Sequence, residues 1–482
     1  MMFQNDIDRK ELFGKLARNP LTYIVIASPF LLYAIILLLP TFDDWTYFTT
    51  PNYNFGDDFI NRLMPNFSWW RPWDALFGYI LSLAPGLFPT LNHIVVYLAH
   101  LVSTFIIYRL AGLFGFNTLG RNIATTFFFA SPAMLGTVLG IDSLNQAYSQ
   151  MWGLAATLVY IEMKGRWRLP LWLAFALIGT FAKENCIMFF FIPQVLAWTT
   201  DKTTVRQALK DTAWALLVIL AYFIARNALI NENVYINEAY FNNTLSRKLK
   251  NIGVFVGMTW IPLDYICLWH APNRNLATVA VTLALGAPFI LYLFFSRPRN
   301  MATRRFIGFT LAILMAAAPH LVTLFSAMHP YAALGMAALM AGYLADRAAN
   351  RKTLTALFIM FLADVAYIDW HHWQKSYESG LTGKRMAEEA IRKLGRSVDK
   401  LGVITIDKGE TRYSSFCVIP YDAFGWGFSI MKETGYEWPA YLYPVTIKEN
   451  ETAKTDSLMR EMKAAGFNKV LLVHGDTVDI IR

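Results

Sequence analysis

Charge is scarce in this sequence. Only 16% of the 482 residues are charged, whereas 55% are hydrophobic, and the mean hydropathy is +0.35. Soluble domains carry closer to a quarter charged residues, so the composition argues against a soluble globular protein. Aromatic residues are plentiful by contrast, with 15 Trp, 23 Tyr and 36 Phe, as is typical of chains that meet membrane–water interfaces.

Several sequence signatures are also lacking. There is no GxxxxGK[ST] segment and no GxGxxG segment after a strand, so a role coupled to bound ATP has no support. No Cys/His cluster has the spacing of zinc ligands. The three cysteines, Cys186, Cys267 and Cys417, are too few for a disulfide framework, although a Cys267–Cys417 bridge outside the cytoplasm stays open.

Long apolar runs dominate the first 370 residues, and they predict a polytopic α-helical membrane protein of about eleven spans. The first run follows a charged lead of twenty residues and has no small-residue cleavage site, so we interpret it as a retained span rather than a signal peptide. The predicted spans are 21–40, 91–113, 122–141, 146–163, 170–182, 185–199, 213–230, 276–296, 306–326, 330–346 and 353–369.

The distribution of Lys and Arg orients these spans. The connections on the side of the N-terminus hold 18 Lys/Arg in 61 residues, and the opposite connections hold 7 in 105. This asymmetry places the N-terminus in the cytoplasm and argues against nucleic acid as the reason for the net charge of +9. The run 251–269 contains Pro262 and Asp264 between tryptophans and suits an interfacial helix better than a span.

The last 112 residues change character and predict a second domain. RMAEEAIRKLG and TDSLMREMKAAGF have the pattern of amphipathic helices, and LGVITID and KVLLVHG that of short strands. We therefore expect a transmembrane domain over 1–370 and a small α/β domain over 371–482, the latter outside the cytoplasm.

The first outer loop, 41–90, carries two pairs of acids. Asp43 and Asp44 stand at the end of the first span, where a carboxylate held close to an acceptor hydroxyl acts as a general base; a solvated acid that caps a helix is the plain alternative. Asp57 and Asp58 lie in a segment with Gly and Asn, where a turn or a helix cap is at least as good an explanation.

Two basic residues on outer connections are candidate phosphate ligands. Arg71 follows Trp70 in WWRPW, where it serves either as an interfacial anchor or as a ligand for a phosphate. Lys183 is the one cation in its short outer turn, and Glu184 beside it offers a simple ion-pair partner.

Further candidates are weaker on their own. His329 and Tyr331 stand at the outer end of the tenth span, where a histidine is more often a structural group than a catalyst. Arg226, near the outer end of the seventh span, is a phosphate ligand or an interfacial anchor. Asp142 lies with Asn145 in a tight turn, and for it helix capping is the default interpretation.

Taken in order, these motifs resemble the GT-C superfamily of polytopic glycosyltransferases, and in particular bacterial relatives of the transmembrane O-mannosyltransferases. The likeness covers roughly the first 345 residues. It departs at one late position, where Met328-His329-Pro330-Tyr331 replaces the usual Glu-Arg-Tyr, and TPR repeats are absent. The matching segments are FDDW (42–45), WWRPWDALFGYIL (69–81), FPTLNHIVVYLAHLVSTFIIYRLAGLFG (88–115), FFFASPAMLGTVLGI (127–141), AKENC (182–186), LKNIGVFVGMTWIPLDY (249–265) and HPYAALGMAAL (329–339).

The resemblance implies transfer of a sugar from a polyprenyl-phosphate donor to a glycan, lipid or protein acceptor on the outer face of the bacterial cytoplasmic membrane. Asp43, or Asp44, would be the base, and inversion at the anomeric carbon is the expected outcome. Arg71 and Lys183 would stabilise the leaving phosphate, with Arg226, His329 and Tyr331 near it. The superfamily has metal-dependent and metal-free members, so a requirement for Mg²⁺ or Mn²⁺ stays open.

Three other functions compete with this one. A transporter or flippase of lipid-linked glycan has many spans, but more often carries charges within the membrane and related halves, and no repeat is present here. A polymerase or ligase of surface polysaccharide is a close chemical relative. A non-enzymatic scaffold, whose outer α/β domain binds partners, leaves FDDW and KEN unexplained.

Overall fold

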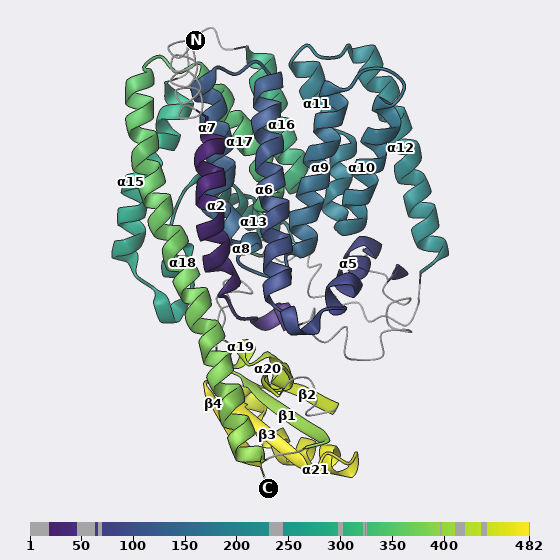
Figure 1. The fold of residues 1–482 in the computed structure, drawn as a ribbon, viewed down its shortest axis with the longest axis vertical. Coiled ribbons are helices and arrows are strands. Elements are labelled where there is room, and N and C mark those ends of the chain that lie inside the picture. Colours follow the sequence, from purple (N-terminus) through teal and green to yellow (C-terminus); the bar gives the residue numbers. More distant parts are fainter. Residues whose placement is uncertain are drawn as a thin grey trace, which may run out of the picture.

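The structure is a computed structural model with a helical part and a smaller α/β part (Figure 1). In the helical part, α15 and α18 lie at one edge and α12 lies at the other. We call the end that faces the α/β part the domain end, and the opposite end the far end. The described residues are 19–45, 63–65, 70–230, 244–296, 302–321, 323, 325–395, 398–409, 420–434 and 441–481.

The helices follow the apolar runs of the sequence, and side-chain caps fix several of their first residues. The side chains of Asn19, Asn117 and Thr204 each accept a hydrogen bond from a backbone N–H in the first turn of the helix that follows. The α-helices before the long last one are α2 (Pro20–Ile36), α5 (Pro72–Ser82), α6 (Thr90–Leu113), α7 (Thr118–Ala130), α8 (Leu135–Val138), α9 (Leu144–Glu162), α10 (Arg168–Ala182), α11 (Ile192–Thr199), α12 (Val205–Ala228), α13 (Leu245–Trp260), α14 (Tyr265–Trp269), α15 (Leu276–Phe295), α16 (Thr303–Ala317) and α17 (Tyr331–Asp346).

Short 3-10 segments connect or extend these helices, most often where proline or a polar residue interrupts an apolar run. They are Phe42–Asp44, Pro85–Leu87, Pro132–Met134, Glu184–Phe190, Ala271–Asn273 and Ala318–Leu321.

Helix α17 is at the centre of the helical part. Every residue from Tyr331 to Ala345 is buried, because its apolar and small side chains leave no polar face. Gly342 of α17 and Gly120 of α7 pack against each other, and a Cβ on either would lie 2.6 Å from the other's carbonyl oxygen. Small residues at such crossings allow helix backbones to approach closely in membrane proteins.

Four of the described helices are long and apolar enough to cross a membrane: α6, α12, α15 and α18 (Arg351–Leu394). The structure therefore supports a helical membrane protein. The other predicted spans also fall on helical segments, but those segments are shorter, broken or less apolar. The number of eleven spans stays a prediction.

The ambiguous run 251–269 is not one continuous helix. Helix α13 ends at Trp260, the backbone is extended around Pro262, and α14 begins at Tyr265 with Asp264 as its N-cap. A proline breaks a helix by removing an N–H donor and clashing with the preceding turn. Neither α13 nor α14 is thus long enough to span a membrane alone, which is compatible with the interfacial interpretation.

Helix α18 joins the two parts. It has 44 residues and continues to Leu394, well past the predicted domain boundary at 370. Its last turns pack Met386, Ala387, Ala390 and Leu394 against one face of a four-stranded sheet. The α/β unit therefore takes part of its core from the helix that connects it to the helical part.

The sheet has the strand order β2-β1-β3-β4, with β4 antiparallel to β3 and the other neighbours parallel. Helix α21 covers the second face through Met462, which packs on Ile404 and Val470. The strands and remaining helical segments are β1 (Lys400–Asp407), β2 (Tyr441–Lys448), β3 (Lys469–His474), β4 (Thr477–Ile481), α19 (Pro420–Ala423), Gly425–Gly427, α20 (Phe428–Glu433), Glu449–Lys454 and α21 (Thr455–Ala464).

Both predicted strands and both predicted helices of this unit are confirmed, as β1, β3, the end of α18 and α21. Strands β2 and β4 are not among the predicted elements. Strand β2 lies at a sheet edge and is mostly exposed, so its sequence lacks the apolar run that marks a buried strand.

Candidate active site

Asp44 ties the loop after α2 to the turn that precedes α9. Its Oδ1 accepts hydrogen bonds from the backbone N–H groups of Ile141 at 2.6 Å and Asp142 at 2.9 Å, and its Oδ2 accepts one from Thr41 at 3.1 Å. The side chain is only 2% exposed. Asp44 is therefore a positioning residue that holds the acid pair at the domain end.

The two acids of FDDW have different surroundings. Burial and the nearby charge of Asp142 raise the pKa of Asp44 well above its usual value, although the three backbone N–H groups act in the opposite direction. Asp43 is partly exposed and lies in the same 3-10 turn. Of the two carboxylates, Asp43 is thus the more accessible.

A short chain of contacts leads from the acid pair to Lys183. Ser143 Oγ donates to Asp142 Oδ1 at 3.2 Å and lies 3.8 Å from the sulfur of Met328. Lys183 Nζ lies 3.5 Å from the same sulfur. Residues from the first outer loop, the turn before α9, the turn after α10 and the turn before α17 therefore meet at one place.

Arg71 and Glu184 form a two-pronged ion pair beside Lys183. Arg71 Nε lies 3.1 Å from Glu184 Oε2 and Arg71 Nη2 lies 3.0 Å from the same oxygen, while the backbone N–H of Trp70 donates to Oε1 at 3.0 Å. Both side chains are about three-quarters buried, with exposures of 26% and 28%. Glu184 thus pairs with Arg71. From the sequence, the neighbouring Lys183 was the simple candidate partner.

Trp70 and Arg226 belong to the same neighbourhood. The Trp70 ring stacks on Tyr222 of α12, with ring centroids 5.3 Å apart. The charges of Glu184, Arg226 and Arg71 all act on the Tyr222 hydroxyl. Three of the predicted cations, Arg71, Lys183 and Arg226, therefore lie around one part of the domain end.

His329 is buried next to a second histidine. Its ring stacks on His320 with centroids 4.3 Å apart, and its Nδ1 accepts a hydrogen bond from the backbone N–H of Ser326. Burial, and then the charges of His320 and Lys183, hold the pKa of His329 well below its usual value. A neutral His329 beside Lys183 offers a hydrogen-bonding group to a phosphate rather than a second positive charge.

Tyr331 lies elsewhere. Its hydroxyl is hydrogen-bonded with His100 Nδ1 at 2.9 Å, and the side chain is fully buried against Phe128. Its hydroxyl thus meets His100 in the buried interior of the helical part, and a role near a donor phosphate stays a prediction. We leave Tyr331 out of the candidate site. Asp57 and Asp58 lie outside the described residues.

The α/β unit contacts the acid pair from the other side. The ring of Phe42 lies 5.5 Å from that of Trp426, and Trp45 packs against Met431. A Cβ added to Gly425 would lie 2.2 Å from the Trp45 ring, so the side chains on both flanks of Asp43 and Asp44 rest on this unit. Ser143, Met328, His320 and these contacts were not among the predicted site residues.

The sequence carried little signal for the missed residues. Asp142 was assigned to helix capping, but the N-cap of α9 is Ser143, and the backbone N–H of Asp142 binds the carboxylate of Asp44 instead. His320 falls within an apolar run, and Met328 has no chemistry that a motif would mark. Only the folded chain brings them beside Lys183.

Comparison with known proteins gives no independent assignment: no family model, curated protein or solved structure matches the chain. The function is therefore argued from the geometry of the site together with the resemblance of its motifs.

Proposed function

We propose that this chain is a membrane glycosyltransferase that takes a sugar from a polyprenyl-phosphate donor. The observation that carries the proposal is convergence. Acids at residues 43–44 and cations at residues 71 and 183 come from distant parts of the chain and meet at one end of the helical part. A donor lipid anchored in the bilayer holds its phosphate at the membrane surface, so a site at the end of the helical part could bind it.

In the proposed reaction, Asp43 takes the proton of an acceptor hydroxyl as its oxygen attacks the anomeric carbon of the donor sugar. The new glycosidic C–O bond forms as the bond to the phosphate oxygen breaks, and the electron pair leaves with polyprenyl phosphate. Arg71 and Lys183 stabilise the negative charge that develops on this leaving group. One base and attack from the far face predict inversion at the anomeric carbon.

Neighbouring residues support these roles. Glu184 fixes the plane of the Arg71 guanidinium, which suits a group that must present N–H donors to a phosphate. Asp44 holds the turn that carries Asp43. Both oxygens of Asp44 already accept backbone hydrogen bonds, so this carboxylate does not fit the role of a Mg²⁺ or Mn²⁺ ligand, and we assign no step to a metal.

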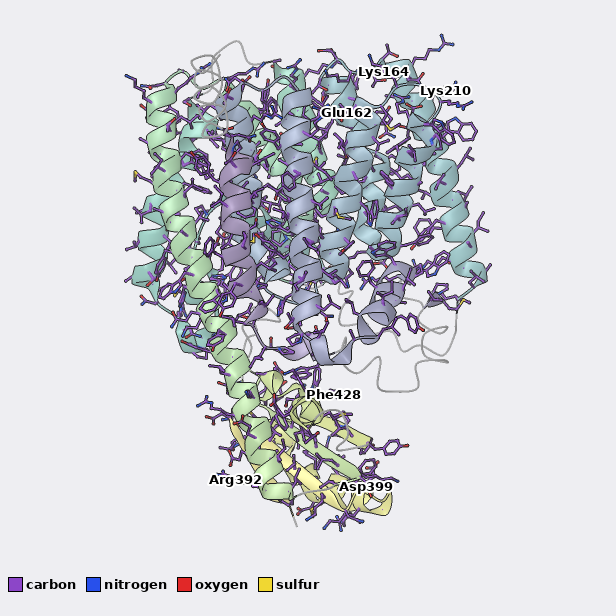
Figure 2. All side chains as sticks on the ribbon, viewed as in Figure 1. Glu162, Lys164, Lys210, Arg392, Asp399 and Phe428 are labelled. Carbon is purple, nitrogen blue, oxygen red and sulfur yellow. The ribbon has the colours of Figure 1, made fainter. Side chains whose placement is uncertain are left out.

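The proposal includes an orientation. Lys164 and Lys210 lie at the far end (Figure 2), on connections that the charge asymmetry assigns to the cytoplasm. The acid pair and the α/β unit would then lie outside the cytoplasm, on the outer face of a bacterial cytoplasmic membrane. The acceptor would be a glycan, a lipid or a protein on that side.

Release of polyprenyl phosphate by the purified protein tests the proposal. Given a polyprenyl-phosphate hexose and a panel of hydroxyl acceptors, the wild type should release polyprenyl phosphate only when an acceptor is present. Asp43→Asn should lower the rate by about 10²- to 10⁴-fold. Asp456→Asn, a change at an exposed acid of the α/β unit, should keep the wild-type rate.

The alternatives give different outcomes in the same assay. A flippase moves the donor without cleaving it, so no polyprenyl phosphate appears. A polymerase or ligase that needs a lipid-diphosphate donor leaves this donor intact, and it releases polyprenyl diphosphate only when a polyprenyl-diphosphate sugar is supplied instead. A scaffold releases neither, and deletion of 371–482 would be its damaging change. Normal release by Asp43→Asn would remove Asp43 as the base.

A further inference from the structure

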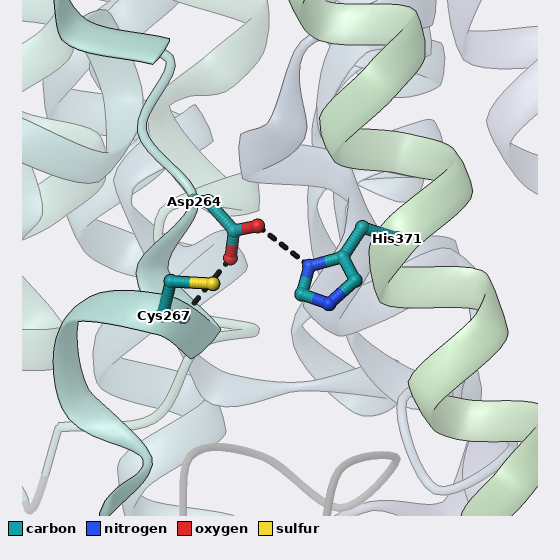
Figure 3. A group of neighbouring side chains, drawn as sticks. All are labelled: Asp264, Cys267 and His371. Atoms are coloured by element: carbon teal, nitrogen blue, oxygen red, sulfur yellow. Dashed lines mark hydrogen bonds and ion pairs between the residues drawn. The ribbon is translucent and has the colours of Figure 1, made fainter. Parts of the chain in front are cut away.

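Three metal-binding side chains meet between the segment after α13 and helix α18. Asp264 is the N-cap of α14, Cys267 lies in its first turn, and His371 is on α18 (Figure 3). The potential ligand atoms of these three residues all lie within 4.8 Å of one another. Since His371 is 104 positions from Cys267, no sequence spacing revealed the group.

Asp264 is the centre of this group. Its Oδ2 lies 2.6 Å from His371 Nδ1, and its Oδ1 accepts from the backbone N–H of Cys267 at 3.0 Å. The Nε2 atom of His372 lies 3.5 Å from Asp264 Oδ1, and both of these side chains are fully buried. Cys267 carries a free thiol. One thiol and two imidazoles thus lie around the Asp264 carboxylate.

A second buried carboxylate lies near the group. Asp364 is two helical turns before His371 on α18 and is only 2% exposed. Among the described residues, neither of its carboxylate oxygens has a hydrogen-bond partner. Its charge interacts with that of Asp264. Two neighbouring buried carboxylates disfavour each other, and a bound cation would relieve this.

We propose that Asp264, Cys267, His371 and His372 form a binding site for one divalent transition-metal ion of the Zn²⁺ type. Sulfur, nitrogen and oxygen donors together are the ligand set of Zn²⁺ and Co²⁺, whereas Mg²⁺ and Ca²⁺ take oxygen ligands. Ligand atoms of Asp264, Cys267 and His371 already lie within 4.8 Å of one another, and His372 Nε2 lies 3.5 Å from Asp264.

A proton would be replaced when the ion binds. Burial, and then the charge of Asp264, raise the pKa of the Cys267 thiol to about 12, so the thiol is protonated before binding. Coordination would release the thiol proton to water, and His371 would bind the ion as a neutral imidazole with its N–H on the other ring nitrogen. The bound ion would fasten the segment after α13 to α18, on elements that contribute no residue to the candidate active site. The site therefore does not depend on the proposed function.

Cobalt titration tests the site. The full chain, purified in detergent without a polyhistidine tag and stripped with a chelator, is titrated with Co²⁺. We expect one ion per chain, a thiolate-to-cobalt charge-transfer band and the intense visible bands of tetrahedral coordination, with displacement by Zn²⁺ and not by Mg²⁺. A Cys186→Ser/Cys417→Ser variant should keep the band, because Cys267 is then the sole thiol.

Matched variants separate a built site from adventitious binding. Cys267→Ser should abolish the charge-transfer band, and His371→Ala should weaken Co²⁺ binding by about 100-fold or more. Asp43→Asn should bind Co²⁺ as the wild type does. A wild type without the thiolate band, or equal binding by wild type and His371→Ala, would overturn the proposal in favour of a metal-free hydrogen-bond network.

Discussion

At the scale of the residue, Asp43 and Asp44 show how two adjacent carboxylates take different tasks. Asp44 is buried, and the three backbone hydrogen bonds that it accepts stabilise the turn. Asp43 keeps partial exposure on the same turn. In the proposed reaction the base needs both access to the acceptor and a fixed position; Asp43 would supply the access and Asp44 the position.

The change Asp44→Asn separates these tasks. Asparagine replaces one carboxylate oxygen with an NH₂ group, which cannot accept a hydrogen bond. At least one buried backbone N–H therefore loses its acceptor. We expect a loss of about 1–3 kcal/mol in stability, measured by thermal unfolding in detergent. Asp43→Asn should keep the wild-type melting temperature and lose sugar transfer. The reverse pattern would contradict the assignment.

The stability difference between wild type and Asp44→Asn should depend on pH. Because the pKa of Asp44 is raised on folding, the native state holds more protons than the unfolded state between the usual carboxyl pKa and the raised value. The contribution of Asp44 is therefore largest at low pH and falls as pH rises through its folded pKa. A stability difference that grows with pH in that window would argue against a raised pKa.

Arg71→Lys tests the phosphate ligand. Lysine keeps the charge but loses the planar fork that pairs with Glu184, so we expect kcat to fall by about 10²-fold or more. Arg109 makes a comparable two-pronged pair with Glu162 at the far end (Figure 2), which makes Arg109→Lys a matched control. Equal activity of the two variants would remove Arg71 from the site.

At the scale of the element, the turn Gly425–Gly427 of the α/β unit supports the loop that carries the acids. All three of its residues have positive φ, at 62°, 52° and 100°. Gly425 has no Cβ, and this lets the ring of Trp45 lie against its backbone. The α/β unit thus takes part in positioning Asp43, whatever else it binds.

Gly425→Ala should displace Trp45 and lower the rate of sugar transfer by about tenfold or more, since small misplacements of a base reduce its efficiency. The control is Gly409→Ala. Gly409 has a similar φ of 71° but open space around its Cβ position, so it carries the backbone strain without the clash. Similar activities of the two variants would show that the contact does not position the acids.

Elements were predictable from the sequence where the signal is local. Apolar runs, caps and strand periodicity predicted the helices of the first part and the two central strands. Each of these patterns involves only a few consecutive residues. Strand β2 was missed because an exposed edge strand carries no such pattern. Helix α18 was cut short at 370 because its amphipathic end resembles a separate helix.

The acids and cations of the candidate site were predictable from the sequence, but their contacts and the residues Ser143, Met328 and His320 were not. Acids and cations at span ends stand out in the sequence because a charged side chain is energetically costly near the membrane interior. The pairing of Arg71 with Glu184 joins residues 113 positions apart, and the Asp264 group joins residues 107 apart. Such contacts depend on how helices pack, which no short pattern encodes. The contact of Tyr331 with His100, 231 positions away, was unpredictable for the same reason.

At the scale of the whole molecule, α18 sets where the α/β unit stands. A helix of 44 residues is about 66 Å long, roughly twice the thickness of the hydrocarbon core of a bilayer. About half of it thus suffices to cross a membrane, and the rest holds the sheet beside the acid pair. Both candidate sites would lie on the same side of the membrane.

This orientation is testable in intact cells. In a background without native cysteines, a membrane-impermeant thiol reagent should label Asp456→Cys in α21 and should not label Lys164→Cys at the far end, although both positions are exposed. Permeabilised cells should show labelling of both variants. Labelling of Lys164→Cys alone in intact cells would reverse the orientation and place the acid pair inside the cell.

The most direct measurement of the central claim is an experimental density map of the protein with a polyprenyl-phosphate sugar bound. The account predicts the donor phosphate within hydrogen-bonding distance of both Arg71 and Lys183, with the anomeric carbon facing Asp43. A donor phosphate bound at the far end, or one that neither cation contacts, would contradict it.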